Sequence, residues 1–240
     1  MRILGIDTAI PTASVALVED GELLVEEIQG GPASPPIGHH AEVILPLIQS
    51  LFDKAEITFN DLSAIAVSIG PGSFTGLRIG LATAKGMAYE SNLALVGVST
   101  LHAGAARVQN FEGLIGCMLD ARKSEVYLAL FRRSQNNLTR LTPDAAVSLQ
   151  TAVELVRKHQ TAGGRALLIG SGAKAYEREI GESFGPSVRI SAGAGYSSMA
   201  AQVALLADRR PDAAALDDLG ALAPVYLRRS EGESKRNNLV

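Results

Sequence analysis

The order in which apolar and amphipathic segments follow one another constrains the fold of this chain more than any single motif. In the first half, strand-like runs cover residues 2–7, 13–18, 22–29, 64–69 and 95–98, and helical segments begin near His39 and Ser73. Turn-forming residues at Pro11-Thr12 and Asp20-Gly21 separate the first three strands, which predicts an antiparallel meander. The first half therefore has the order β-β-β-α-β-α-β.

The second half repeats this order. Expected strands cover residues 114–119, 125–133, 138–141, 165–169 and 188–190, and expected helices cover 148–159, 173–180 and 197–208. Two tandem β-β-β-α-β-α-β units predict a duplicated α/β fold like that of actin, the sugar kinases and Hsp70 (the ASKHA class). We expect an N-terminal lobe over 1–103, a C-terminal lobe over 104–227 and a polar, disordered tail over 228–240.

A glycine-rich segment, Ile69 to Gly80, joins an apolar strand to a helix that Ser73 or Thr75 can cap. In actin-like folds nucleotide binds between the lobes, and the first strand turn touches phosphate. The candidate phosphate-loop residues are Asp7, Thr8, Gly70, Gly72, Ser73 and Gly76. The spacing matches neither Gly-x-x-x-x-Gly-Lys-Ser/Thr nor Gly-x-Gly-x-x-Gly, so a phosphate loop with weak nucleotide binding and a plain strand-to-helix turn both remain open.

Composition excludes several classes of protein. The 240-residue chain is 47% hydrophobic and has a formal net charge of −3, which argues against a main nucleic-acid binder. Cys117 is its only cysteine, which rules out an internal disulfide and favours a reducing compartment. We see no signal-peptide pattern and no membrane-spanning run, so we expect a cytoplasmic protein.

Two helical segments are more apolar than one core requires. The segment after His39 has a wide apolar stripe, and the segment after Ser73 carries only Arg78 and Lys85 as charges before Glu90. Small residues at Gly76, Gly80 and Ala84 lie four apart, which allows a second helix to approach closely. We expect this helix pair to bind another chain.

Residue patterns for hydrolytic or metal chemistry are missing from the sequence. Its histidines, His39, His40, His102 and His159, form no His-x-x-x-His pair, and no Gly-x-Ser-x-Gly elbow occurs. Asp7, Asp120 and Glu125 are candidate acids, but nothing in the sequence shows that they converge. We expect no metal site and no catalytic residues.

Five segments in the same order resemble one family over nearly the whole chain. They are Ile3-Leu-Gly-Ile-Asp-Thr8, His40-x-Glu42-x-x-x-Pro46, Gly70-Pro-Gly-Ser-Phe-Thr-Gly-Leu-Arg-Ile-Gly80, Asp120-Ala-Arg-x-x-Glu-Val-Tyr127 and Pro224-x-Tyr-Leu-Arg228. Together they are similar to the bacterial TsaB (YeaZ) family, formerly labelled glycoprotease-like.

The resemblance implies a non-catalytic subunit in the N6-threonylcarbamoyladenosine (t6A) modification of the adenosine beside the tRNA anticodon. It implies that a paralogue, TsaD, carries the chemistry with a metal-binding His-x-x-x-His, where this chain has Thr100 and Gly104. It also implies a heterodimer with TsaD, a homodimer when alone, a third component, the ATPase TsaE, that uses ATP, and contact with tRNA only through the complex. No cofactor of its own is implied.

The residues expected to face the partner lie on the two apolar helices. They are Glu42, Leu45, Pro46, Gln49, Arg78, Leu81, Ala82, Lys85 and Tyr89. One alternative is an actin-like ATPase or small-molecule kinase that uses Asp7-Thr8, the Gly70 loop and Gly170-Ser-Gly172 around a nucleotide. A metallopeptidase is a second alternative, which the missing histidine pair disfavours.

Overall fold

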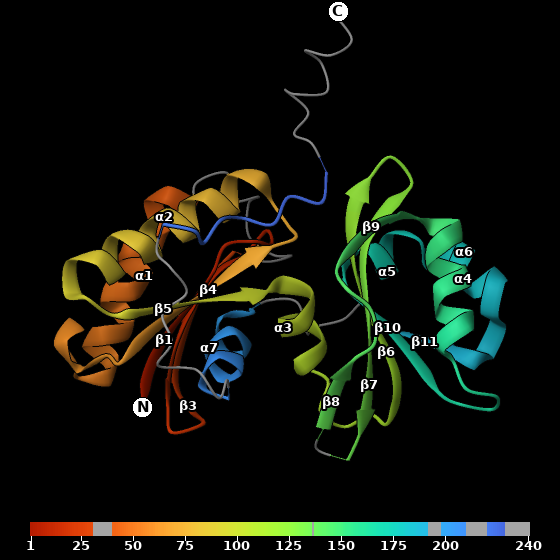
Figure 1. Ribbon diagram of the computed structural model, residues 1–240, viewed down its shortest axis with the longest axis horizontal. Helices are drawn as coiled ribbons and strands as arrows, with labels where there is room; N and C mark the ends of the chain where they lie inside the picture. Colours follow the sequence, from red (N-terminus) through yellow and green to blue (C-terminus); the bar gives the residue numbers. More distant parts are fainter. Residues whose placement is uncertain (31–39, 136, 192–197, 210–219, 229–240) are drawn as a thin grey trace, which may run out of the picture.

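The computed structural model describes residues 1–30, 40–135, 137–191, 198–209 and 220–228. Two β-sheets lie side by side, each with helices on its outer face (Figure 1). Several expectations lie outside the described residues: the helix start at His39, the start of the last helix at Ser197, and nearly all of the tail.

The first sheet has the strand order β3-β2-β1-β4-β5. Its strands are β1 (Arg2–Asp7), β2 (Ala13–Glu19), β3 (Glu22–Gln29), β4 (Ala64–Gly70) and β5 (Ala94–Ser99). The first three pair antiparallel, as predicted, whereas β4 and β5 run parallel to β1. The crossover connections are α1 (His40–Ala55), followed by a 3-10 turn (Phe59–Asp61), and α2 (Phe74–Ser91), both on one face of the sheet (Figure 1).

The second sheet repeats this topology, with the order β11-β10-β6-β7-β8. Its strands are β6 (Gly113–Arg122), β7 (Glu125–Ser134), β8 (Asn137–Arg140), β9 (Ala145–Ser148), β10 (Ala166–Ile169) and β11 (Val188–Ser191). The helices α4 (Leu149–His159), α5 (Ser171–Ala175) and α6 (Glu177–Phe184), with a 3-10 turn (Gly185–Ser187), cover its outer face. The matching order in both sheets confirms the duplicated actin-like fold.

Three short elements differ from the expectation. The helix α3 (Thr100–Ala106) and the strand β9 are additional, and the helix expected over 173–180 is two helices that meet at Tyr176. Each of the added elements has only four to seven residues, so neither shows a full period of an amphipathic pattern.

The last helix, α7 (Ala200–Asp208), packs on the first sheet, against β1, β2 and β4. The Ser14 hydroxyl on β2 accepts hydrogen bonds from the amides of Met199 and Ala200, at 3.4 and 3.3 Å. A side chain at Gly5 of β1 would overlap the backbone of Ala200. We expected residues 197–208 in the C-terminal lobe, and this placement was wrong because the chain returns to the N-terminal sheet before it ends.

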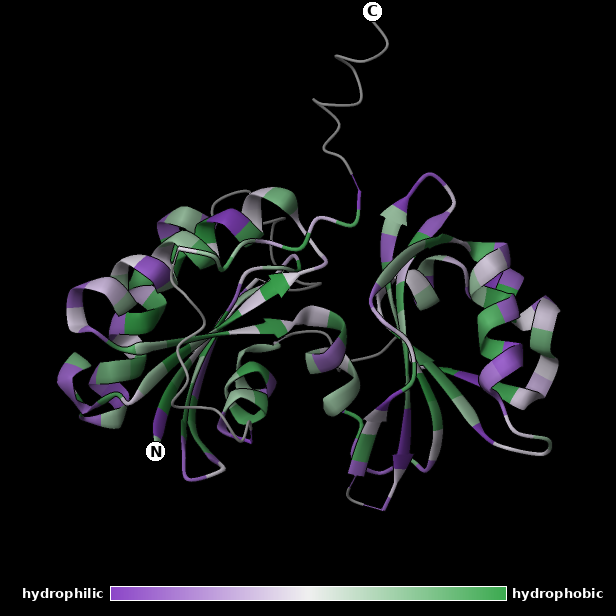
Figure 2. Cartoon of the chain, in the orientation of Figure 1, coloured by the Kyte–Doolittle hydropathy of each residue, from purple (hydrophilic) through white to green (hydrophobic). Residues whose placement is uncertain are grey.

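The molecule is built in layers around apolar clusters. The helices α1 and α2 cover the outer face of the first sheet, α3 and α7 lie between the sheets, and α4, α5 and α6 cover the outer face of the second. The middle cluster joins Ile3 and Val96 of the first lobe to Phe131 of the second. Figure 2 shows hydrophobic residues along both sheets. Within the described ranges, no helix is long and apolar enough to span a bilayer.

Candidate functional site: the inter-lobe cleft and the outer helix pair

The glycine-rich segment packs tightly against the turn between β1 and β2. Of the two expected caps, Ser73 and Thr75, the structure shows Ser73, because its hydroxyl accepts a hydrogen bond from the Gly76 amide at 3.2 Å. The Ser73 amide itself donates to the Ala9 carbonyl at 2.8 Å, and the Thr8 hydroxyl donates to the Gly76 carbonyl at 2.7 Å. A side chain at Gly76 would overlap the Thr8 carbonyl oxygen. The glycines therefore let the β1–β2 turn approach the helix.

This packing determines which of the candidate phosphate-loop residues are accessible from the cleft between the lobes. Asp7, Thr8 and Gly76 are buried, and the backbone of Gly70 lies against Val225. Only Gly72 and Ser73 of the candidate set line the open cleft. The Ser73 amide already has a protein partner, so these residues do not fit the phosphates of a nucleotide.

Asp7 is a buried acid at the end of β1. It has no exposed surface, and among the described residues it has no ion-pair partner. Burial raises the pKa of the Asp7 carboxyl to about 6, although the nearby Ser68 hydroxyl and the hydrogen bond from the Ala9 amide oppose the shift. A carboxyl in this position weakens the fold whenever it is ionised.

A cleft of about 740 Å³ opens between the two lobes at the carboxyl ends of the parallel strands. Its N-terminal wall includes Pro71, Ser73 and His40, and its C-terminal wall includes the β6–β7 hairpin and Tyr127. Burial is the main cause that raises the pKa of the Tyr127 hydroxyl. Of the acids that the sequence singled out, Asp120 lines this cleft, Asp7 lies beneath its wall, and Glu125 binds the C-terminal segment described next.

A C-terminal strap, residues 220–228, connects the two lobes across this cleft. The Val225 amide donates to the Ile69 carbonyl at 2.7 Å, which fixes the strap beside the end of β4. The Tyr226 ring stacks on Phe74 with centroids 4.5 Å apart, and its hydroxyl accepts a hydrogen bond from Arg78 Nε at 2.9 Å.

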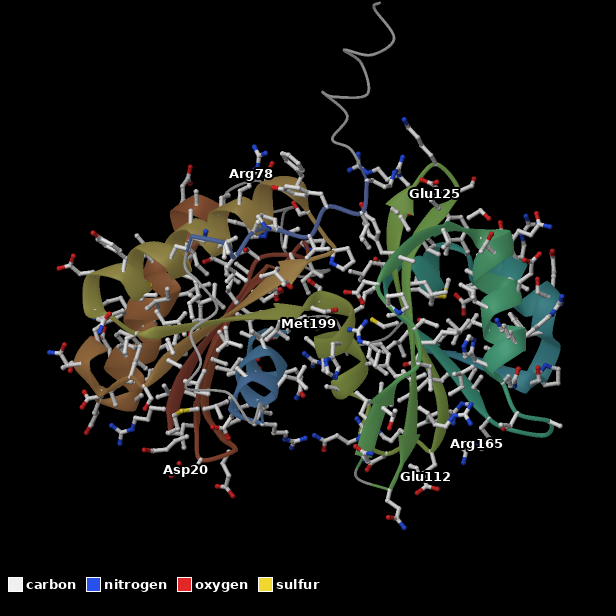
Figure 3. The ribbon with its side chains drawn as sticks, in the orientation of Figure 1. Asp20, Arg78, Glu112, Glu125, Arg165 and Met199 are labelled. Atoms are coloured by element: carbon white, nitrogen blue, oxygen red, sulfur yellow. The ribbon has the colours of Figure 1, made fainter. Side chains whose placement is uncertain are left out.

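The end of the strap binds the other lobe. Arg228 Nε lies 3.1 Å from the Glu125 carboxylate, and the Arg228 guanidinium also donates to the carbonyls of Ala121 and Arg122. Figure 3 shows Arg78 and Glu125 on opposite sides of the strap. Two of the five family-like segments, 120–127 and 224–228, therefore meet in space, which their sequence spacing did not reveal.

The exposed outer surface of α1 and α2, here called the α1–α2 face, carries most of the residues expected to meet a partner. The exposed residues of that set are Glu42, Leu45, Pro46, Gln49, Arg78, Ala82 and Tyr89, and Lys85 is half-buried. Leu45 is 57% exposed and Tyr89 is 80% exposed, which is unusual for large apolar side chains. This surface lacks cover in the single chain.

Leu81 was wrongly placed on this face. It is only 4% exposed and packs in the core between α2 and the first sheet. The small residues Gly76 and Gly80 also face inward, since a side chain at either would meet Thr8. The small stripe of α2 serves contact with its own lobe, and the larger residues face outward.

The two positions that the resemblance compared with a metal-binding histidine pair fall on α3 in this chain. Thr100 begins that helix and Gly104 lies one turn later, and both are buried. Across the parts of the chain that the structure describes, no three histidine, cysteine, aspartate or glutamate side chains form a possible metal site. Nearby, burial is the main cause that lowers the pKa of His102 to about 4, with the Arg140 cation adding to it.

Two lobes of equal strand order, with a cleft at the carboxyl ends of their parallel strands, define a duplicated actin-like protein. A family model described as TsaD, tRNA N6-adenosine threonylcarbamoyltransferase, matches residues 35–225. The TsaB protein of Bacillus subtilis (strain 168), described as a tRNA threonylcarbamoyladenosine biosynthesis protein, is 30% identical over 98% of this chain and 97% of its own length. The Escherichia coli (strain K12) TsaB is 34% identical over 79% of each chain.

A solved structure of YeaZ from Pseudomonas aeruginosa has a TM-score of 0.76 and 25% identity, and the match covers 94% of this chain and 99% of that one. The chain belongs to the TsaB (YeaZ) family of tRNA threonylcarbamoyladenosine biosynthesis proteins.

Proposed function

We propose that this chain is a non-catalytic subunit that supports t6A formation on tRNA by binding a TsaD-like catalytic paralogue through its α1–α2 face. An ATPase of the TsaE type joins the complex and uses ATP there, and the same face forms a homodimer when the paralogue is absent. The chain works in the cytoplasm and meets its substrate RNA as part of this complex.

The exposure of Leu45 and Tyr89 is the observation that carries this proposal. Both side chains lie on helices whose opposite faces already pack on the first sheet, so a partner would bury the outward face. Stable complexes bury about 1,200–2,000 Å² in total, and aromatic anchors contribute strongly to their affinity. Arg78 and Lys85 add charges that fix the register of the two helix pairs.

The binding experiment compares two double variants with the purified paralogue by size-exclusion chromatography. Leu45→Glu/Tyr89→Glu places two carboxylates on the α1–α2 face and should weaken the heterodimer on the order of 100-fold. Leu23→Glu/Leu24→Glu is the control, because these side chains are 45% and 48% exposed and belong to the edge strand β3 instead of α1 or α2. If both double variants formed the heterodimer equally well, the α1–α2 face would not be the interface.

A reconstitution tests the role itself. The paralogue, the ATPase, ATP and unmodified tRNA are combined with and without this chain, and t6A is measured by mass spectrometry of digested RNA. We expect modification to depend on this chain and to fail with Leu45→Glu/Tyr89→Glu. Equal modification without the chain would refute the functional proposal.

A further inference from the structure

A second concavity lies on the C-terminal lobe, away from the cleft and from the α1–α2 face. It has a volume of about 570 Å³ and is lined by three arginines from three different elements. Arg157 belongs to the last turn of α4, Arg165 precedes β10, and Arg189 lies on β11. Figure 3 shows Arg165 at the lower edge of the second lobe and Arg78 at the upper edge of the first. We call this concavity the arginine hollow.

Hydrogen bonds fix the shape of the hollow. The side-chain amide of Gln160 donates hydrogen bonds to the Gly164 carbonyl at 2.9 Å and to the Ser187 carbonyl at 3.1 Å, and so connects the two loops that contain these residues. Arg157 donates to the Ser183 carbonyl at 2.9 Å and lies over the Phe184 ring. Arg165 lies over Phe111, with its guanidinium carbon 5.3 Å from the ring centre. Two of the three guanidinium groups are therefore held by residues that border the hollow and do not line it.

The charge of the hollow is not neutralised locally. Within the described ranges, none of the three arginines forms an ion pair, and neither does the adjacent Lys158, whereas Arg178 on the same lobe lies beside Glu179 and Glu182. All three arginines and Lys158 are exposed. On a chain of net charge −3, this hollow therefore presents to solvent three guanidinium groups that have no carboxylate partner among the described residues.

We propose that the arginine hollow binds backbone phosphates of the RNA on which the complex acts, a contact that rests on the proposed function in t6A formation. Guanidinium groups donate paired hydrogen bonds to phosphate, and several on one surface attract a polynucleotide through release of its counterions. The hollow contributes affinity and orientation without reading the base sequence. It lies far from the α1–α2 face, so a docked paralogue leaves it open (Figure 3).

The test measures binding of fluorescently labelled unmodified tRNA by the full-length chain over a series of salt concentrations. Arg165→Gln/Arg189→Gln removes two charges from the hollow. Lys174→Gln/Arg178→Gln removes two charges from the same lobe and is the matched control, since both of those side chains have carboxylate neighbours. Heterodimer formation with the paralogue is measured in parallel for each variant.

The hollow variant should bind tRNA roughly tenfold more weakly, and the slope of log affinity against log salt should fall by about 2, whereas the control stays within about twofold of wild type. Both variants should keep the heterodimer, so a failure of assembly reports on the proposed function and not on the hollow. Equal losses in the two variants, or no tRNA binding by the wild-type chain, would overturn the proposal.

Displacement of labelled tRNA by competing anions shows whether the hollow binds RNA phosphates or another anion. Inorganic phosphate at the ionic strength of a chloride reference should displace tRNA no better than chloride does, and polyglutamate should displace it less well than unlabelled tRNA. Displacement by inorganic phosphate at low concentration would assign the hollow to a free anion, and displacement by polyglutamate as effective as that by tRNA would assign it to an acidic protein segment. Either result would refute the RNA contact.

Discussion

The turns that follow the first strand of each lobe occupy corresponding places in the two sheets but differ in exposure: the first is buried and the second is open to solvent. In the N-terminal lobe, Thr8 and Ala9 are sealed beneath the start of α2 by backbone contacts. In the C-terminal lobe, Arg122, Lys123 and Ser124 project into solvent, each with a positive φ of 54° to 61°. One turn is closed by its helix, and the other is an open hairpin beside the cleft.

The length of the connection to the next helix explains the difference. Three residues, Pro71 to Ser73, separate β4 from α2, and they carry the helix start over the turn. Only Gly170 separates β10 from α5, so that helix begins beside Leu119 and leaves the hairpin free. The duplicated topology therefore gives two similar sheets. The length of the loop before the next helix determines in which of them the turn after the first strand is accessible to a ligand.

The largest expected effect comes from filling the sealed turn. In Gly76→Ala the new methyl overlaps the Thr8 carbonyl, and we expect a loss of about 3 kcal/mol in the free energy of unfolding. Gly172→Ala, whose methyl would lie 2.9 Å from the Leu119 carbonyl carbon, should lose about 1 to 2 kcal/mol. Urea unfolding measures both.

Gly181→Ala is the control for helix propensity, because its methyl would meet no atom within 4 Å, and it should stabilise α6 by up to about 1 kcal/mol. Equal stability of Gly76→Ala and Gly181→Ala would contradict a sealed turn.

The next effect concerns pH. The Asp7 carboxyl has a folded-state pKa of about 6 against an ordinary value of 3.8, so the folded protein holds a proton that the unfolded chain has lost. Stability should therefore fall as pH rises from about 4 to 6 and stay level above that range. In Asp7→Asn this fall disappears. The free energy of unfolding of the variant, relative to that of the wild type, should therefore increase by about 2 to 3 kcal/mol between pH 4 and pH 7.

Unfolding midpoints in urea at pH 4, 5, 6 and 7 give this difference. Asp120→Asn, which changes the exposed aspartate of the open hairpin, is the matched control and should follow the wild-type curve. If Asp7→Asn also followed that curve, the buried carboxyl would not govern the pH dependence.

The smallest effect concerns the C-terminal strap that connects the two lobes. Arg228→Gln loses the partly exposed ion pair with Glu125 and should cost about 0.5 to 1 kcal/mol, and less at high salt. Hydrogen exchange at the Val225 amide, which is bonded to Ile69, should become faster. Arg178→Gln, at an exposed pair on α6, should leave that amide unchanged. Unaltered exchange in both variants would show that Arg228 does not hold the strap.

Local patterns predicted most of the fold, and contacts distant in sequence account for what they missed. Alternating and apolar runs located ten of the eleven strands that the structure describes, and residue type narrowed the cap of α2 to Ser73 or Thr75. Leu81 was misplaced because α2 is apolar on most of its surface, so periodicity could not say which side faces the sheet. The bond between Arg78 and Tyr226 spans 148 positions, and no local signal marks it.

The place of α7 has a consequence for how the chain is made. The inner face of the first sheet, with Ile3 and Ala66, is covered by Val203 and Ala204 near the end of the sequence. The second sheet, by contrast, is complete by Ser191. During synthesis from the N-terminus, the lobe that emerges first must wait for residues that follow the whole second sheet. We expect the second lobe to mature first on the ribosome, and the first lobe to expose one apolar face until α7 has emerged.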